Sequence, residues 1–185
     1  KYNMEYDANC KKCTRLDHFL LKTKEKYPTY FCKPVPSFGD KEPGLLVVGL
    51  APGMHGANNT GRPFTGDHAG ILLYKTLFMF GFASKSSSVS ADDDLILNNC
   101  RITNAVKCLP PENKPSLEEV KNCTSFLRAE LNNLPNNTIV LALGLVAHSA
   151  LLIALDCQKN NYKFSHGGRH VLPNKLVLYN SYHCS

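Results

Sequence analysis

The sequence predicts an α/β fold with three layers, α/β/α, in which helices cover both faces of a central four-stranded parallel sheet. Four short apolar runs have the length and composition of buried strands, and they cover residues 45–50, 101–107, 138–143 and 176–179. Segments with the apolar spacing of helices separate these runs. Strands that alternate with helices favour parallel pairing through right-handed crossovers. The length suits a single domain, which we expect to cover residues 1–185.

The predicted helices have recognisable ends. A first helix reaches about residue 26, and Asp7 or Asn9 is expected to cap it. A second helix, over about residues 68–80, is expected to end at Gly81 in the left-handed conformation. Ser116 and Glu119 have the spacing of a capping box, which predicts the start of a third helix. A fourth helix is expected over residues 145–155.

Composition and charge limit the classes of protein to consider. The formal net charge of +6 is compatible with a polyanionic partner. No apolar stretch is long enough to span a membrane, and no signal peptide is visible, so we expect an intracellular protein. The chain starts at Lys1 and stops at Ser185, and we expect it to be trimmed at both ends and to act as a monomer.

A long polar loop follows the first predicted strand, at the edge where open α/β sheets bind ligands. It contains Phe64, an isolated aromatic residue that no periodic core face requires, and Asp67, a carboxylate at the expected start of a helix. Asn104, Asn113 and His183 follow other strands, so we expect them near the same edge. A ring, an amide and an imidazole are typical of a pocket for a flat nucleobase. The simpler alternative for Asp67 is that it only caps the helix.

Eight cysteines are many for an intracellular chain of this size. Cys10 and Cys13 form a C-x-x-C motif, and Cys108 and Cys123 form a second, wider pair. Four thiolates could bind zinc or an iron–sulfur cluster, and the wide second spacing favours the cluster. The other four cysteines look structural, among them Cys32, which is expected to be buried.

Four motifs together resemble the iron–sulfur uracil-DNA glycosylases. They are GLAPGMHGANNTGRPFTGD at 49–67, ITNAVKCLPPENKP at 102–115, FSHGGRHVLP at 164–173 and SYHCS at 181–185. The GLAP opening and the FTGD sequence are most similar to the family 5 (type B) branch, with some features of family 4. The resemblance implies the glycosylase-like α/β/α fold and a [4Fe–4S] cluster on the four cysteines named above. It also implies a monofunctional hydrolase of base excision repair that removes uracil, and in this branch also hypoxanthine, from DNA.

The resemblance also implies roles for individual residues. Phe64 would stack on the extruded base, and His183 would stabilise the negative charge on the departing base. The turn at Leu50 and Ala51 carries no carboxylate, so Asp67 is expected to orient water or stabilise the sugar cation. Asn104 matches the base-reading amide of family 4 and Asn113 an amide of the family 5 site. Other expected substrate contacts come from the first motif: Gly49, Ala51, Pro52, Gly53 and His55.

Two other functions fit the same residues. The chain could be a non-catalytic iron–sulfur module that binds damaged DNA or senses redox state and leaves the base attached. It could also be a zinc-stabilised nucleotide-binding domain. Comparing binding with base release separates the first alternative from an enzyme, and the metal content of the purified protein separates the second.

Overall fold

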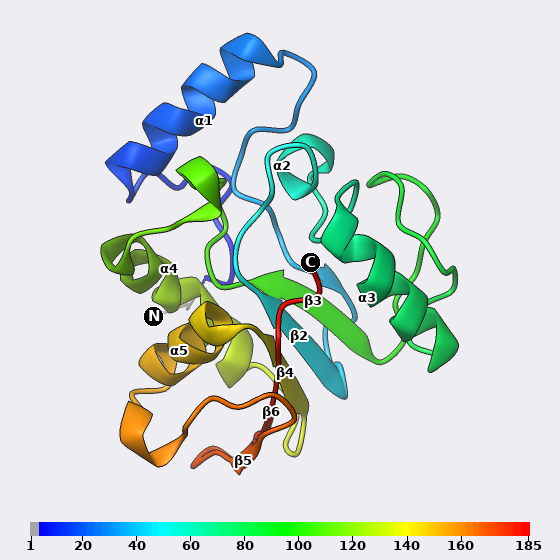
Figure 1. The fold of residues 1–185 in the computed structure, drawn as a ribbon, viewed down its shortest axis with the longest axis vertical. Coiled ribbons are helices and arrows are strands. Elements are labelled where there is room, and N and C mark those ends of the chain that lie inside the picture. The colour runs from blue at the N-terminus through cyan, green and yellow to red at the C-terminus, as the bar shows by residue number, and fades with distance from the viewer. Residues whose placement is uncertain (1–3) are drawn as a thin grey trace.

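Four parallel strands form the centre of the sheet, as predicted. The computed structural model describes residues 4–185, and its sheet has six strands in the order β1-β3-β2-β4-β6-β5 (Figure 1). The inner strands β3, β2, β4 and β6 pair in parallel, whereas β1 and β5 add short antiparallel pairs at the two edges. The strands are β1 (Phe38–Gly39), β2 (Leu45–Gly49), β3 (Cys100–Asn104), β4 (Ile139–Leu143), β5 (Arg169–Val171) and β6 (Val177–Ser181).

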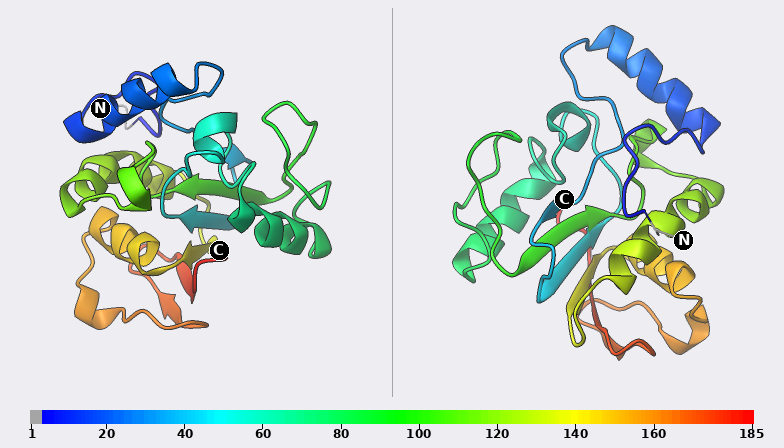
Figure 2. Two further views of the ribbon diagram at one scale, coloured as in Figure 1. Left: turned by 45° about the horizontal axis from the view of Figure 1, so that its top comes forward. Right: turned by 180° about the vertical axis from the view of Figure 1, so that it is seen from behind.

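Helices cover both faces of this sheet. Figures 1 and 2 show α4 and α5 on one face and α3 on the other, with α1 at the periphery beside α4. The helices are α1 (Thr14–Lys26), α2 (Ala57–Thr60), α3 (His68–Met79), α4 (Leu117–Asn132) and α5 (Leu145–Ala154), with short 3-10 turns at Pro111–Asn113 and Lys159–Asn161. The three-layer arrangement places the carboxyl ends of the parallel strands along one edge, where the following loops meet.

Strand β2 shows how the sheet holds the two helical layers. Leu46 and Val48 pack into an apolar cluster with α4 and α5, and Val47 packs into a separate cluster with α3. All three side chains are fully buried. Because side chains alternate across a strand, a continuous apolar run supplies both faces. Burial of each such side chain contributes about 1.5–3 kcal/mol to stability, so β2 is a strongly fixed support for the loop that follows it.

Some predicted element ends are confirmed and two are wrong. The second strand, predicted to reach residue 107, ends at Asn104. Ser116 and Glu119 form the capping box of α4, and Gly81 follows α3 with a φ of +81°. Helix α1, however, begins only at Thr14, and its N-cap, Cys13, makes no side-chain cap bond. Asp7 instead accepts a hydrogen bond from the Asn9 N–H at 2.9 Å in a separate turn. The Cys10 N–H donates to the Asp7 carbonyl oxygen at 3.2 Å, so the segment before α1 forms a turn of its own.

Within residues 4–185, no helix has both the length and the apolar character that crossing a membrane requires.

Candidate active site

A pocket of about 420 Å³ lies at the carboxyl edge of the parallel strands. It falls within the size range of small-ligand sites. Side chains from the β2–α3 loop, the end of β3, the segment after β3 and the segment after β6 share its wall. Its lining residues are Leu50, Ala51, Gly53, Ala57, Phe64, Asp67, His68, Ala69, Asn104, Asn113, His183 and Ser185. The pocket therefore unites both proposed catalytic residues with most of the proposed base-contacting ones.

Phe64 forms an aromatic wall of the pocket. Its ring centroid lies 6.0 Å from that of His183, with 29° between the ring planes. The side chain is only 6% exposed, and a Cβ atom at Gly49 would lie 2.6 Å from the ring. Glycine at position 49 is thus required for the ring to pack against the end of β2. The flat face that remains toward the pocket suits stacking on another ring.

Asn104 places an unpaired acceptor in the same pocket. The residue ends β3 and is 3% exposed, and no described residue forms a hydrogen bond with its Oδ1 atom. A Cβ atom at Gly49 would lie 2.5 Å from that oxygen, so the amide also depends on the glycine. A buried polar atom without a partner costs free energy unless a ligand pairs with it. The unpaired Oδ1 atom is therefore a candidate acceptor for a hydrogen bond from a ligand.

One carboxylate oxygen of Asp67 caps α3, and the other faces the backbone of the β2–α3 loop. Oδ1 accepts a hydrogen bond from the Gly70 N–H at 3.0 Å and caps α3, so the capping role is real. Cβ atoms built at Gly56 and Gly53 would lie 2.5 Å and 3.5 Å from Oδ2. These two glycines leave room for the carboxylate to approach the loop backbone. The cap thus fixes the side chain while Oδ2 stays available for a second role.

The segment after β6 brings His183 to the pocket. The Cys184 thiol contacts the Ala69 carbonyl oxygen at 3.4 Å and pins this segment against the start of α3. Partial burial lowers the pKa of His183 below its usual value, while the nearby Asp67 carboxylate acts in the opposite direction. The lowered pKa favours the neutral imidazole, which can donate one N–H to a ligand atom.

The electrostatic link between these two residues gives a testable result. We expect the pKa of His183 to fall further in the Asp67→Asn variant, because that change removes the carboxylate that favours the charged imidazole. An NMR titration of the imidazole resonances measures this shift. The exposed His18 on α1 is the internal control, and its chemical shifts should be the same in both proteins. A His183 midpoint that rises in the variant would contradict the assigned proximity.

The segment after β3 holds Asn113 at the rim of the pocket. Glu112 and Asn113 have φ values of +54° and +57°, a backbone conformation that residues other than glycine seldom adopt. Asparagine tolerates it better than most residues. The 3-10 turn at Pro111–Asn113 therefore directs an exposed amide to the pocket, and such unusual backbone often occurs at functional sites.

The structure does not bring every proposed contact into the pocket. Pro52 is buried and does not line the cavity. His55 turns away, with Nδ1 2.8 Å from the Tyr30 hydroxyl and its ring edge-on to that of Tyr27. Gly49 does not line the cavity either, but its lack of a side chain leaves room for the Phe64 ring and the Asn104 amide. Sequence reasoning missed five lining residues, namely Leu50, Ala57, His68, Ala69 and Ser185. Of these five, only His68 could have been proposed from the sequence, because it is a polar, titratable residue next to Asp67.

The four cysteines predicted to act together lie in one region of the molecule. Cys10, Cys13 and Cys108 pack against the apolar cluster that contains Cys123. Burial raises the pKa of the Cys108 thiol, and the other three cysteines of the group raise it further. The Asn122 amide donates to the Cys13 sulfur at 3.5 Å. Among residues 4–185, no three His, Cys, Asp or Glu side chains form a site for a single metal ion.

A buried carboxylate ties α1 to α4 and so brings the two cysteine pairs together. The Arg15 guanidinium donates to both oxygens of Glu119, at 2.9 and 2.5 Å. It also donates to the Lys114 carbonyl oxygen at 3.0 Å. The Arg15 hydrogen bond lowers the pKa of Glu119 below its usual value, and the Ser116 backbone adds to this effect. This two-point contact fixes α1, and with it Cys13, against the helix that carries Cys123.

Comparison with known proteins agrees with this geometry. Residues 36–185 match the family model described as the uracil DNA glycosylase superfamily. A type-5 uracil-DNA glycosylase of Thermus thermophilus is 46% identical over 84% of this chain and 71% of its own length. One of Pyrobaculum aerophilum is 42% identical over 96% and 79%. A type-4 enzyme of the same archaeon is 36% identical over 73% and 62%, which agrees with the predicted branch. The chain belongs to the uracil DNA glycosylase superfamily.

Proposed function

We propose that this protein hydrolyses the N-glycosidic bond of uracil in DNA and so starts base excision repair. The observation that carries the proposal is the unpaired Asn104 Oδ1 in a pocket that also holds the Phe64 ring, the Asp67 carboxylate and the His183 imidazole. Uracil presents an N–H beside a carbonyl oxygen on one edge, which matches a side-chain amide. The type-5 relatives named above support the same substrate.

The target nucleotide must leave the duplex to reach this pocket. Unstacking costs a few kcal/mol and costs least for a mispaired base, so we expect uracil opposite guanine to be a good substrate. Phe64 replaces part of the lost stacking on one face of the base. Asn104 reads the edge, because a site built around hydrogen bonds rejects analogues that lack the matching groups. Hypoxanthine, a deaminated purine, is a second expected substrate in a pocket of this volume.

The chemistry assigned to the side chains follows from their charge. The bond between C1′ and the base nitrogen breaks, and its electron pair leaves with uracil. The oxygen of a water molecule bonds to C1′, and the proton that this water loses passes to the Asp67 carboxylate and from there, through solvent, to the uracil anion. His183, as a neutral donor, hydrogen-bonds the carbonyl oxygen on which negative charge develops. Asp67 stabilises the positive charge on the sugar and orients the attacking water. We assign to Asn113, which lines the pocket, the role of holding that water or the sugar.

The partner is DNA that contains uracil or another deaminated base. The formal charge of +6 favours approach to a polyanion. One chain holds all of the assigned residues, so we propose that it acts as a monomer. Excision from genomic DNA would place the protein inside the cell, in the nucleoid if the source is bacterial.

The test of the proposal is base release from duplexes with a single U·G, U·A or hypoxanthine pair, with binding measured on the same DNA. We expect free uracil and abasic DNA in equal amounts. Tight binding without base release would instead identify the non-catalytic module considered above. If the protein neither binds nor releases a base from any of these duplexes, the proposal is overturned.

We also propose that Cys10, Cys13, Cys108 and Cys123 hold a [4Fe–4S] cluster. The donor set fits this group, because four thiolates are its usual ligands and the four side chains share one region. The cluster would supply a covalent tie between the segment before α1 and helix α4. These residues lie outside the pocket, so their proposed role is to hold the fold and not to take part in base release.

Metal analysis tests the cluster directly. We expect about four iron atoms per chain in protein purified without oxygen, and loss of iron and of its visible absorption in Cys108→Ser. The matched control is Cys157→Ser, which changes a partly buried cysteine outside the group and should keep the iron. Bound zinc in place of iron, or full iron content in Cys108→Ser, would contradict the assignment.

A further inference from the structure

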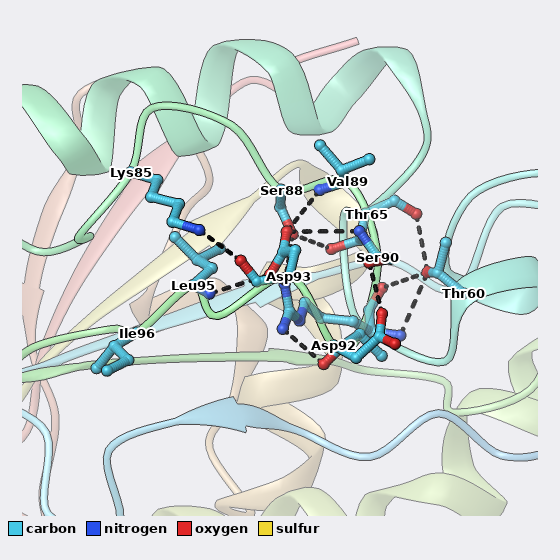
Figure 3. Close-up of polar contacts among 12 residues, drawn as sticks. Thr60, Thr65, Lys85, Ser88, Val89, Ser90, Asp92, Asp93, Leu95 and Ile96 are labelled. Carbon is cyan, nitrogen blue, oxygen red and sulfur yellow. Dashed lines mark hydrogen bonds and ion pairs between the residues drawn. The ribbon is translucent and has the colours of Figure 1, made fainter.

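A buried ion pair links the turn that carries Phe64 to the segment 84–95. The Arg62 Nη1 atom lies 2.7 Å from Oδ1 of Asp93, and the two side chains are only 6% and 14% exposed. Figure 3 shows Asp93 at the centre of a group of polar contacts that joins this segment to Thr60 and Thr65 of the β2–α3 loop. The two partners are 31 residues apart in the chain.

Within residues 4–185, every hydrogen bond of the Arg62 guanidinium goes to this one segment. Besides Asp93, it donates to the Ser88 hydroxyl at 3.0 Å and to the Ala91 carbonyl oxygen at 2.9 Å. Its flat face lies 4.2 Å from the centroid of the Phe38 ring. A planar fork with several donors suits this arrangement, and a lysine ammonium could not reproduce it. These contacts therefore fix the orientation of the Arg62 guanidinium, and the Asp93 carboxylate balances its charge.

Asp93 is itself held firmly by its own segment. Its carboxylate accepts hydrogen bonds from the Val89 N–H at 2.8 Å and the Leu95 N–H at 3.1 Å. Burial would raise the pKa of Asp93, but the Val89 N–H, the Arg62 guanidinium and the Leu95 N–H hold it well below its usual range. The carboxylate is thus ionised and held by hydrogen bonds from its own segment, which makes it a firm anchor for Arg62.

The turn between Arg62 and Thr65 needs such an anchor. The Thr65 N–H donates to the Arg62 carbonyl oxygen at 3.3 Å and closes a turn with Pro63 and Phe64 at its centre. Phe64 has a φ of +54°, at the position of a type II turn that normally needs glycine or asparagine. A bulky residue keeps this conformation only when its surroundings enforce it.

The other side of the turn is fixed by the same segment and by α3. The Thr65 hydroxyl lies 2.6 Å from the Ser88 hydroxyl, and the Tyr74 hydroxyl donates to the Pro63 carbonyl oxygen at 2.7 Å. Burial raises the pKa of Tyr74 to about 12, so its hydroxyl remains a donor at any working pH. Contacts therefore hold the turn on both sides of Phe64.

We propose that the Arg62–Asp93 pair is a positioning device that sets the Phe64 ring for stacking on the extruded base. The inference rests on the proposed function, because the ring faces the pocket assigned to that base. Arg62 and Asp93 do not line the pocket and act only through the turn. The segment 84–95 is thereby part of the active-site architecture, although it supplies no reacting group.

The effect of loosening the pair should appear in substrate binding. Arg62→Lys keeps the positive charge but loses the planar guanidinium with its several donors. The turn then no longer holds the Phe64 ring in its position. We expect kcat/KM for uracil excision to fall about 10- to 100-fold, through a higher KM with kcat nearly unchanged. Arg101→Lys is the matched control, because the Arg101 side chain, at 14% exposed, is largely buried like that of Arg62 and pairs with Glu5 at 3.0 Å, at the start of β3. It should leave KM unchanged.

A double-mutant cycle with Phe64→Ala separates positioning from general stabilisation. Alanine makes the same backbone demand as phenylalanine, so this change removes only the ring. If Arg62 acts through the ring, Arg62→Lys should have almost no further effect on KM in the Phe64→Ala background. Losses that add in full would overturn the proposal. So would an unchanged KM in Arg62→Lys.

Two further points keep the test decisive. If Arg62→Lys is unfolded at the assay temperature, the same cycle is run with Ser88→Ala, which removes one contact of Arg62 and one of Thr65. The same non-additive result is expected, and additive losses there overturn the proposal equally. An inactive wild-type protein would instead contradict the proposed function, so the two failures are distinguishable.

Discussion

Replacing Asp67 with asparagine should lower kcat for uracil excision by about 10²–10⁴-fold, the usual contribution of a group that handles a proton or a developing charge. Oδ2 of Asp67 approaches the loop at Gly53 and Gly56, inside the pocket wall. An amide can neither stabilise a sugar cation by charge nor activate water. KM should change little, because the carboxylate acts mainly on the transition state.

Asparagine is the right replacement because it retains the cap of α3. Its side-chain oxygen can still accept the hydrogen bond from the Gly70 N–H, which Oδ1 accepts at 3.0 Å in the native protein. The thermal midpoint should therefore stay near that of the wild type. Asp40→Asn is the matched control, since Asp40 also accepts a backbone N–H, from Glu42, but lies outside the pocket. Full activity in Asp67→Asn would leave the carboxylate with its capping role only.

Replacing His183 with alanine should lower kcat by about 10²–10³-fold, as loss of one donor to a developing oxyanion does in other enzymes. The imidazole lies 6.0 Å from the Phe64 ring, and burial lowers its pKa, which favours the neutral form. Uracil leaves as an anion, so the loss falls on the bond-breaking step.

Two further variants sharpen this second result. His183→Asn returns an N–H donor at a shorter reach and should recover part of the rate. His170→Ala is the control, because His170 contacts the Lys163 carbonyl oxygen away from the pocket. A His183→Ala protein with the wild-type rate would remove the imidazole from the mechanism.

Local patterns were enough to predict the centre of this fold. The buried runs of the four parallel strands and the Ser116–Glu119 capping box are signals that neighbouring residues carry by themselves. Strands β1 and β5 were missed, because two or three residues at a sheet edge show no periodicity. The start of α1 was placed too early, because Asp7 makes a turn of its own and α1 docks through Arg15.

In the candidate site, too, some features could be predicted from local sequence and others could not. Phe64, Asp67, Asn104 and His183 were predicted together, because each follows or ends a strand and such ends meet at one edge. His55 remains only a predicted contact, because its side chain turns to Tyr30 and does not line the pocket, an orientation that nothing local in the sequence indicates. The Arg62–Asp93 pair could not be predicted, because a contact between residues 31 positions apart depends on how the whole segment folds back.

A structure of the Asp67→Asn variant bound to a duplex with a single U·G pair tests the central claim most directly. The account predicts uracil outside the helix, with its ring on Phe64, its edge paired with the Asn104 amide and a carbonyl oxygen facing His183. Uracil that remains stacked in the duplex, or that occupies another part of the surface while this pocket stays free of any base, would contradict it.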